Sequence, residues 1–277
     1  MKLNILVLFD GAGLAMRGLL DAGHDCTGVE LMPEKAHLSK LLNPDAKGHI
    51  VANVLDLDRG WIESFDAVWS SPPCQSRSTS NKGNKTTQAQ EKREVNDNLL
   101  EWSLALKNKV LWVENVIDLG GYNSWGSLWN AAQFLNNPIQ CRSRVIGGCY
   151  QNPIIYRGYK PEYSHDGYHI SPTVQASMAK RLKIVGIQNI GVRASTCEEF
   201  YGYAPTLDEA AYLQGLTIPL DWYDPIEGYS WSQWQENLYQ AIGNGVPTYM
   251  ARAFGEAYSK PKESFIAKQI SMFTEAL

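Results

Sequence analysis

The sequence predicts an α/β fold in which an open sheet carries a small inserted domain. From residue 3 to residue 115, short apolar segments alternate with amphipathic ones, as strands and helices do in such folds. Several apolar segments end in polar or proline-containing turns. From about 151 to 205 the alternation is lost, and Tyr, Pro and Gly become frequent. We therefore expect a main domain over 1–150, an insert over 151–205, and a segment over 206–277 that returns to the main domain.

Composition excludes several other classes of protein. Of the 277 residues, 44% are hydrophobic and 19% are charged, which is usual for a soluble globular protein. No apolar run approaches the roughly 20 residues of a membrane span, and the N-terminal run is too short for a signal peptide. The five cysteines are odd in number and contain no C-x-x-C pair. We therefore expect a protein of a reducing compartment, without a metal site and without membrane contact.

Charge is distributed unevenly along the chain. The net charge of −4 does not by itself suggest a nucleic-acid partner, but residues 194–240 contain no Lys or Arg. Residues 77–93 hold five cations against Glu91, namely Arg77, Lys82, Lys85, Lys92 and Arg93. This polarity fits either a basic face for nucleic acid or ordinary solvated charge, and charge alone does not separate the two.

The N-terminal residues predict a strand, a glycine turn and a helix. Residues 3–9 are typical of a buried strand, Gly11–Gly13 forms a G-x-G turn, and residues 14–23 predict a helix that ends at a glycine. The glycines allow a ligand to approach the backbone, and the helix N-terminus offers free N–H groups. A second strand over 26–30 ends in Glu30, whose carboxylate can bind two ribose hydroxyls.

The glycine spacing bears on which adenosine-containing cofactor would fit this turn. A dinucleotide fingerprint has a third glycine, and Met16 stands at that position here. The pattern leans against a nicotinamide dinucleotide and leaves S-adenosylmethionine open.

The later segments continue the alternation up to residue 148. We expect further helices over 33–42, 95–106 and 124–135, and further strands over 50–56, 109–115 and 140–148. Residues 76–90 are polar and long for a connection, which favours a mobile lid. After the insert we expect a helix over 206–214, with a capping box from Thr206 to Glu209. Residues 242–247 then lead into a helix that runs to about Tyr258, and the tail 262–277 predicts one more.

A cysteine lies where the strand that begins at Phe65 runs out into a loop. Pro72 and Pro73 end the strand, because proline supplies no N–H, and Cys74 follows at the carboxyl edge of the sheet. A lone cysteine after a strand is usually an inert hydrophobe. Glu114, at the end of the next strand, changes that interpretation, because it adds a carboxyl group at the same edge.

Two arginines complete a set of groups suited to one reaction. Arg142 and Arg144 are two residues apart on an expected strand and so share a face. Methylation of carbon 5 of a pyrimidine needs a thiolate that adds to carbon 6, an acid at N3 and a cation at O2. Cys74, Glu114 and Arg144 or Arg142 could supply these groups.

At this point the chain resembles the DNA (cytosine-5) methyltransferases over nearly its full length. Seven motifs match in the order found in that family: Phe9-x-Gly11-x-Gly13, Glu30, Pro73-Cys74-Gln75, Glu114-Asn115-Val116, Gln140-x-Arg142-x-Arg144, Leu213-Gln214-Gly215 and Gly243-Asn244-x-Val246. The resemblance implies a Rossmann-like S-adenosylmethionine-dependent methyltransferase sheet, with residues 151–205 as a small target-recognition insert. It implies S-adenosylmethionine as methyl donor and, as substrate, a cytosine flipped out of double-stranded DNA.

The resemblance also assigns roles to individual residues. Cys74 takes the role of nucleophile, Glu114 contacts N3, and Arg144, with Arg142 behind it, contacts O2 and anchors the loop. Cofactor contacts fall on Phe9, Gly11, Gly13, Glu30, Leu31, Asn53, Asp56, Pro73, Asn244 and Val246. Asn53 stands where the family usually has an acid for the adenine amino group, and Asp56 follows three residues later.

The expected biology follows from the same resemblance. We expect a compact phage- or bacterial-type enzyme, cytoplasmic and monomeric, and the resemblance leaves open a restriction endonuclease as partner in a restriction-modification system. An RNA-acting enzyme of the tRNA type is the first alternative, although its Cys-Phe-Thr signature is absent. A nicotinamide-dependent oxidoreductase would leave Cys74 unexplained, and the presence of both Cys74 and Glu114 argues against a non-catalytic DNA-binding relative.

Overall fold

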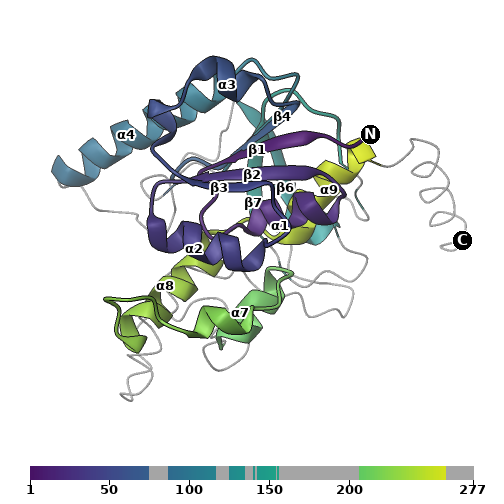
Figure 1. The fold of residues 1–277 in the computed structure, drawn as a ribbon. Helices are drawn as coiled ribbons and strands as arrows, with labels where there is room; N and C mark the ends of the chain where they lie inside the picture. Colours follow the sequence, from purple (N-terminus) through teal and green to yellow (C-terminus); the bar gives the residue numbers. More distant parts are fainter. Residues whose placement is uncertain are drawn as a thin grey trace, which may run out of the picture.

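A seven-stranded sheet forms the centre of the protein (Figure 1). The computed structural model describes residues 1–74, 87–116, 125–134, 140, 142–153, 155 and 206–259. Within them the strand order is β3-β2-β1-β4-β5-β7-β6. The strands are β1 (Asn4–Leu8), β2 (Asp25–Glu30), β3 (Gly48–Val51), β4 (Ala67–Ser70), β5 (Val110–Asn115), β6 (Gly126–Asn130) and β7 (Ser143–Gly147).

Most of the sheet is parallel. Strands β3, β2, β1, β4 and β5 pair in parallel, whereas β7 runs antiparallel to both β5 and β6. The carboxyl ends of the five parallel strands therefore meet at one edge of the sheet, where ligand sites of α/β proteins lie. The predicted fold class, an open Rossmann-like α/β sheet, is confirmed.

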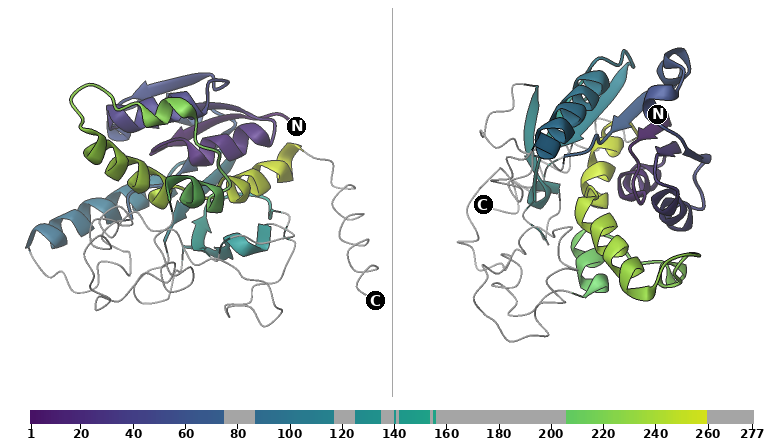
Figure 2. Two further views of the ribbon diagram at one scale, coloured as in Figure 1. Left: turned by 90° about the horizontal axis from the view of Figure 1, so that it is seen from below. Right: turned by 90° about the vertical axis from the view of Figure 1, so that its left-hand side faces the viewer.

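Helices cover both faces of the sheet (Figures 1 and 2). Successive strand residues point to opposite faces, so Ile5 and Val7 of β1 pack with α1 and α9, while Leu6 and Leu8 pack with α3 and α4. A third cluster joins α2 to α7 and α8 around Trp222. The helices are α1 (Leu14–Asp21), α2 (Pro33–Leu42), α3 (Arg59–Glu63), α4 (Thr87–Leu104), α7 (Leu207–Leu213), α8 (Trp231–Asn244) and α9 (Thr248–Ser259), with 3-10 turns at Val54–Asp56, Ala131–Phe134 and Leu220–Tyr223.

Several expected elements have the positions that the sequence predicts. Helix α2 has the expected bounds, and α1 ends just before Gly23, which has the left-handed φ of +92°. The capping box of α7 is present, because Thr206 Oγ1 accepts from Glu209 N at 3.2 Å while Glu209 Oε2 accepts from Thr206 N at 2.8 Å. These features depend on local sequence alone.

The helix expected over 124–135 is wrong. Residues 126–130 form strand β6, and only Ala131–Phe134 is helical, as a 3-10 turn. Strand β6 exists because it pairs with β7, with Trp129 opposite Arg144. Gly126 lies so close to the backbone of Ile146 and Gly147 that a Cβ would collide with them. Such pairing is a long-range choice that helical periodicity does not report.

Other bounds differ from those expected. Helix α4 begins at Thr87 rather than Val95, so its first turns come from the expected polar loop. Strand β3 ends at Val51, and Asn53 instead caps a 3-10 turn. The helix expected after residues 242–247 is α9, which runs from Thr248 to Ser259, although residues 242–244 already belong to α8. Helix α8 was not predicted, although Ser230 and Gln233 form a capping box at its start.

Some predictions fall outside the described residues. These are the lid over most of 76–90, nearly all of the insert over 151–205, and the tail helix over 262–277. No helix in the described part of the chain is long and apolar enough to cross a membrane. Among the same residues, no three or more His, Cys, Asp or Glu side chains group closely enough to hold a metal ion.

Candidate active site

A cavity of about 710 Å³ opens at the carboxyl edge of the parallel strands. Residues directly after β1, β2, β3 and β4 line it, together with Glu114 near the end of β5, part of α4 and the end of α8. Eleven of the predicted site residues lie on its walls: Phe9, Gly11, Glu30, Leu31, Asn53, Pro73, Cys74, Glu114, Arg144, Asn244 and Val246. Gly13, Asp56 and Arg142 are not among the lining residues.

Glu30 ties two loops of the cavity together. Its Oε2 accepts a hydrogen bond from the backbone N–H of Gly11 at 2.8 Å, and its Oε1 accepts from that of Met32 at 3.0 Å. Each carboxylate oxygen has a further lone pair, so Glu30 can still accept bonds from the hydroxyls of a ligand. The carboxylate therefore both shapes the floor of the cavity and offers acceptors within it.

The turn after β1 has a strained backbone. Phe9 has a φ of +56°, which is unusual for a residue other than glycine and costs on the order of 1–3 kcal/mol. Gly11 follows with a φ of +60°, and a Cβ at this position would meet no atom within 4 Å. The open space above Gly11 belongs to the cavity, so the glycine keeps room there for a ligand.

Gly13 serves the packing of helices instead. It precedes α1 with a φ of +81°, and a Cβ on it would collide with the side chains of Asn43 and Ser39 from α2 and its end. Asn43 Nδ2 also donates to the Gly13 carbonyl at 3.0 Å. The contact seen for Gly13 is thus with α2, and not with the cavity.

Asp10, between the strand and the glycines, is an ionisable residue that the sequence reasoning left without a role. Its side chain is 8% exposed and lines the cavity, and Ser39 Oγ donates to its Oδ2 at 2.5 Å. Its Oδ1 is buried without a hydrogen-bond partner among the described residues. Burial, with a smaller contribution from the charge of Glu30, raises the pKa of Asp10 to about 8 although the Ser39 hydrogen bond opposes the shift. The sequence feature that could have identified Asp10 is an acidic residue between an apolar strand and a G-x-G turn.

Asn53 and Asp56, the two candidates for the adenine contact, lie in different environments. Asn53 lines the cavity, and its Oδ1 accepts from Leu55 N at 3.1 Å as a cap of the 3-10 turn. Asp56 is exposed and is absent from the cavity wall. Of the two, Asn53 is the residue whose side chain a cavity ligand could reach.

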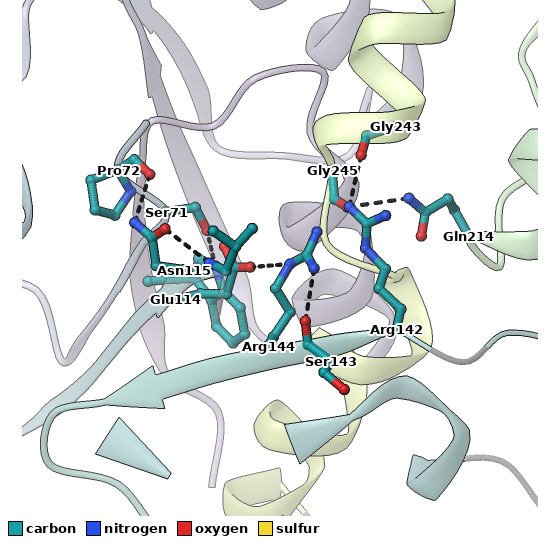
Figure 3. A network of polar contacts seen from close by, with 12 residues as sticks. Ser71, Pro72, Glu114, Asn115, Arg142, Ser143, Arg144, Gln214, Gly243 and Gly245 are labelled. Atoms are coloured by element: carbon teal, nitrogen blue, oxygen red, sulfur yellow. Dashed lines mark hydrogen bonds and ion pairs between the residues drawn. The ribbon is translucent and has the colours of Figure 1, made fainter. Parts of the chain in front are cut away.

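Cys74 also lines the cavity, in the turn after β4. The turn that carries it is held by Asn115, whose Nδ2 donates to the Pro72 carbonyl at 3.2 Å (Figure 3). Burial raises the pKa of the Cys74 thiol, while the nearby Arg144 guanidinium lowers it and Glu114 raises it further. The thiol is therefore held mainly protonated until a substrate changes its surroundings.

Glu114 and Arg144 form a buried ion pair beside Cys74. Arg144 Nε lies 2.7 Å from Glu114 Oε1, and the two side chains are 9% and 7% exposed (Figure 3). Arg144 also donates from Nη1 to the Ser143 carbonyl at 2.8 Å. The pairing of β5 with β7 brings the two residues together, since Glu114 lies opposite Ile146 in the antiparallel register. A thiol, a carboxylate and a guanidinium thus border one cavity.

Arg142 points elsewhere. It is 1% exposed, and its Nη2 donates to the carbonyls of Gly243 at 2.7 Å and Gly245 at 3.1 Å (Figure 3). The two arginines were predicted to lie on one face of a strand, and in the structure their side chains have different partners. Arg144 pairs with Glu114, and Arg142 binds the turn between α8 and α9. That turn carries Asn244 and Val246 to the cavity wall.

The middle of α4, from residue 91 to residue 99, forms a wall that the sequence did not predict as part of the site. Six of its residues line the cavity, namely Glu91, Lys92, Arg93, Val95, Asn96 and Leu99. Two of these, Lys92 and Arg93, belong to the basic stretch found in the sequence. The cavity therefore has cations along one side of its mouth.

The fold has counterparts among solved structures. No protein-family model matches the chain, and no curated protein sequence matches it significantly. Among solved structures, the Entamoeba histolytica methyltransferase EhMeth is 16% identical with a TM-score of 0.56 and covers 94% of this chain and 100% of its own. The S. pombe Dnmt2 methyltransferase is 15% identical with a TM-score of 0.54 and covers 93% of this chain and 98% of its own.

A third similar structure comes from a bacterial prophage. It is a proposed DNA modification methyltransferase encoded within a prophage of E. coli, and it is 14% identical with a TM-score of 0.53. The match covers 96% of this chain and 100% of that one. Because the identities are so low, these similarities establish a shared fold and do not establish a shared function.

Proposed function

We propose that the protein transfers a methyl group from S-adenosylmethionine to carbon 5 of a cytosine in DNA. The observation that carries the proposal is that Cys74, the Glu114–Arg144 pair and the glycine turn at Gly11, which is hydrogen-bonded to Glu30, border one cavity. The first three residues are the groups that carbon-5 chemistry needs, and the turn suits an adenosine-containing ligand. The shared fold with structures described as methyltransferases supports the same conclusion.

The residues present fit S-adenosylmethionine. The space above Gly11 admits a ligand against the backbone, and Glu30 keeps acceptors for ribose hydroxyls. Leu31, Asn53 and Pro73 line the same cavity. Asn244 and Val246 line it from the end of α8 and the turn that follows. When bound, this cofactor supplies an electrophilic methyl group.

Cys74 begins the proposed reaction. Its thiol loses a proton to solvent, and the Sγ–C6 bond forms while the C5–C6 π electrons move into the ring toward N3. Glu114, once it has taken up a proton, donates a hydrogen bond or that proton to N3 as this charge develops, and Arg144 donates to O2. Because the ion pair already fixes both side chains, neither group needs to be reoriented when the ring arrives.

The later steps restore the ring and the enzyme. Carbon 5, made electron-rich by the addition at carbon 6, forms the new bond to the methyl carbon. Loss of the C5 proton to a base then expels the Cys74 thiolate, and the C5–C6 double bond returns. Cys74 lies inside a cavity, and a base that is stacked in a duplex cannot enter it. The cytosine therefore has to leave the duplex stack to reach Cys74.

The recognition step is assigned to the rest of the chain. We propose that residues 151–205 choose the target sequence and that the cations at the cavity mouth, Lys92 and Arg93, lie near phosphates. The order of the three segments, 1–150, 151–205 and 206–277, would then divide catalysis from recognition.

Transfer of labelled methyl groups tests the proposal. The protein is incubated with labelled S-adenosylmethionine and, in separate reactions, with duplex DNA, RNA, and DNA containing 5-fluorocytosine. We expect label in DNA, and a covalent protein–DNA adduct with the fluorinated base, because fluorine at carbon 5 blocks release of Cys74. Cys74→Ala abolishes both while it keeps cofactor binding. Absence of label and adduct, or full activity in Cys74→Ala, rejects the mechanism, and label in RNA alone replaces DNA with RNA as substrate.

A further inference from the structure

The junction between α8 and α9 is held by side chains from distant parts of the chain. Arg142 and Gln214 converge there (Figure 3), and Gln140 supports Gln214 from behind. Each of the three residues is at most 1% exposed. Gln140 and Arg142 lie just before β7, and Gln214 directly follows α7. In the sequence they belong to two separate motifs, so only the fold reveals that they act on one turn.

Two of these side chains bind the open end of α8. The last carbonyls of a helix have no partner within the helix. Gln214 Nε2 donates to the Ile242 carbonyl at 2.7 Å and to that of Gly245 at 3.3 Å. Arg142 Nη2 donates to the Gly243 and Gly245 carbonyls, which also places a positive charge at the negative end of the helix dipole.

Gln140 sets the direction of the Gln214 amide. Its Nε2 donates to Gln214 Oε1 at 3.1 Å and to the Leu213 carbonyl at 2.8 Å. With its oxygen occupied in this way, the Gln214 amide presents its NH2 group to α8. The backbone adds a further contact, because Thr248 N donates to the Gln214 carbonyl at 2.9 Å. The turn is therefore fixed on both sides, from α8 and from α9.

We propose that Gln214 and Arg142 are positioning residues that hold the turn over 243–246 as a wall of the cofactor part of the cavity. Asn244, Gly245 and Val246 line the cavity, whereas neither Gln214 nor Arg142 does. The two buried side chains thus act on a ligand only through the turn. The inference rests on the proposed function, since it takes the ligand of this wall to be S-adenosylmethionine or its product.

Removal of the Gln214 amide separates a positioning role from a general effect on stability. In Gln214→Ala, the Ile242 and Gly245 carbonyls lose a donor, and the turn can leave its position. We expect the Kd for S-adenosylhomocysteine, measured by calorimetry without nucleic acid, to rise about tenfold. Gln133→Ala is the matched control, because Gln133 is also buried, at 6%, and its Oε1 accepts from Asn130 N at 2.7 Å away from the cavity wall. It should lower the Tm but leave the Kd within about twofold.

Arg142→Lys is a second, milder variant. It keeps the charge but loses the planar guanidinium, so we expect the Kd for S-adenosylhomocysteine to rise about threefold. If Gln214→Ala does not fold, this variant tests the positioning role in its place. Folded variants that bind S-adenosylhomocysteine as tightly as the wild type overturn the inference. So does a Gln133→Ala variant that loses as much affinity as Gln214→Ala. A wild-type protein that binds neither S-adenosylmethionine nor S-adenosylhomocysteine rejects the proposed function instead, so the two failures are distinct.

Discussion

Arg144 Nε lies 2.7 Å from Glu114 Oε1, and both side chains are more than nine-tenths buried. A buried ion pair contributes little net stability, because removal of the two charges from water offsets their attraction. Loss of only one partner is costly, since the other charge stays buried. The pair is better explained as a preset arrangement for the reaction than as a source of stability.

Arg144→Ala should therefore destabilise the protein strongly. We expect the free energy of unfolding in urea to fall by about 3–5 kcal/mol, because Glu114 keeps a buried charge without a partner. Addition of Glu114→Gln should recover part of this loss. Arg252→Ala is the control, since its ion pair with Glu256 on α9 has the same kind of geometry, at 2.9 Å, but a half-exposed arginine, and should cost less than about 1 kcal/mol. Equal losses in the two single variants would contradict this view of the pair.

Asp10 should make stability depend on pH. Its pKa of about 8 in the folded protein lies above the ordinary value of 3.8, so the folded state holds a proton that the unfolded state loses first. The contribution of Asp10 is therefore fully present below about pH 4 and is lost as pH rises to about 8. Asp10→Asn keeps the shape of the neutral acid and removes this dependence.

The measurement for Asp10 is urea unfolding at several pH values. Between pH 5 and pH 8 the variant should gain on the order of 2–4 kcal/mol of stability relative to the wild type. Ser39→Ala, which removes the hydrogen bond to Oδ2, should retain the pH dependence. Parallel pH profiles for the wild type and Asp10→Asn would show that Asp10 is ionised throughout.

The two glycines of the turn should respond differently to alanine. Gly13→Ala brings a Cβ into Ser39 and Asn43, so we expect a large loss of stability and a lowered Tm. Gly11→Ala meets no atom, and its cost of about 1 kcal/mol comes from the left-handed backbone alone. It should nevertheless weaken binding of S-adenosylhomocysteine, because the new methyl group occupies ligand space.

Gly23→Ala provides the control for Gly11→Ala. Gly23 also has a positive φ, of +92°, and also has no atom within 4 Å of the Cβ position, but it is not part of the cavity wall. The two variants should have similar Tm values, and only Gly11→Ala should raise the Kd. If both bind the ligand normally, the space above Gly11 does not hold the cofactor.

Cys74 should react slowly with alkylating reagents in the absence of substrate. Burial raises the pKa of its thiol, and only the thiolate is nucleophilic. We expect iodoacetamide at pH 7.5, followed by mass spectrometry, to modify the exposed Cys149 well before Cys74. Because Arg144 lowers the pKa of Cys74, Arg144→Met should slow alkylation of Cys74 further without an effect on Cys149. Faster alkylation of Cys74 than of Cys149 would refute the assignment of a protonated resting thiol.

The sequence by itself determined the parts of the protein that depend on near neighbours. The α/β class, the β1–turn–α1 unit and the capping box of α7 follow from short patterns. The positions of Cys74 and Glu114 followed as well, because residues at the ends of parallel strands meet at one edge whatever the details of packing.

Only the tertiary structure decided the features that depend on long-range pairing. Strand β6 exists through its antiparallel pairing with β7, and the pairing of β7 with β5 sets Arg144 against Glu114. Arg142 and Gln214 meet at the end of α8 although 72 residues separate them along the chain, and Gly13 is required by α2 rather than by a ligand. A side chain's partner is fixed by the register and packing of distant segments, and residue spacing along the chain carries no record of either.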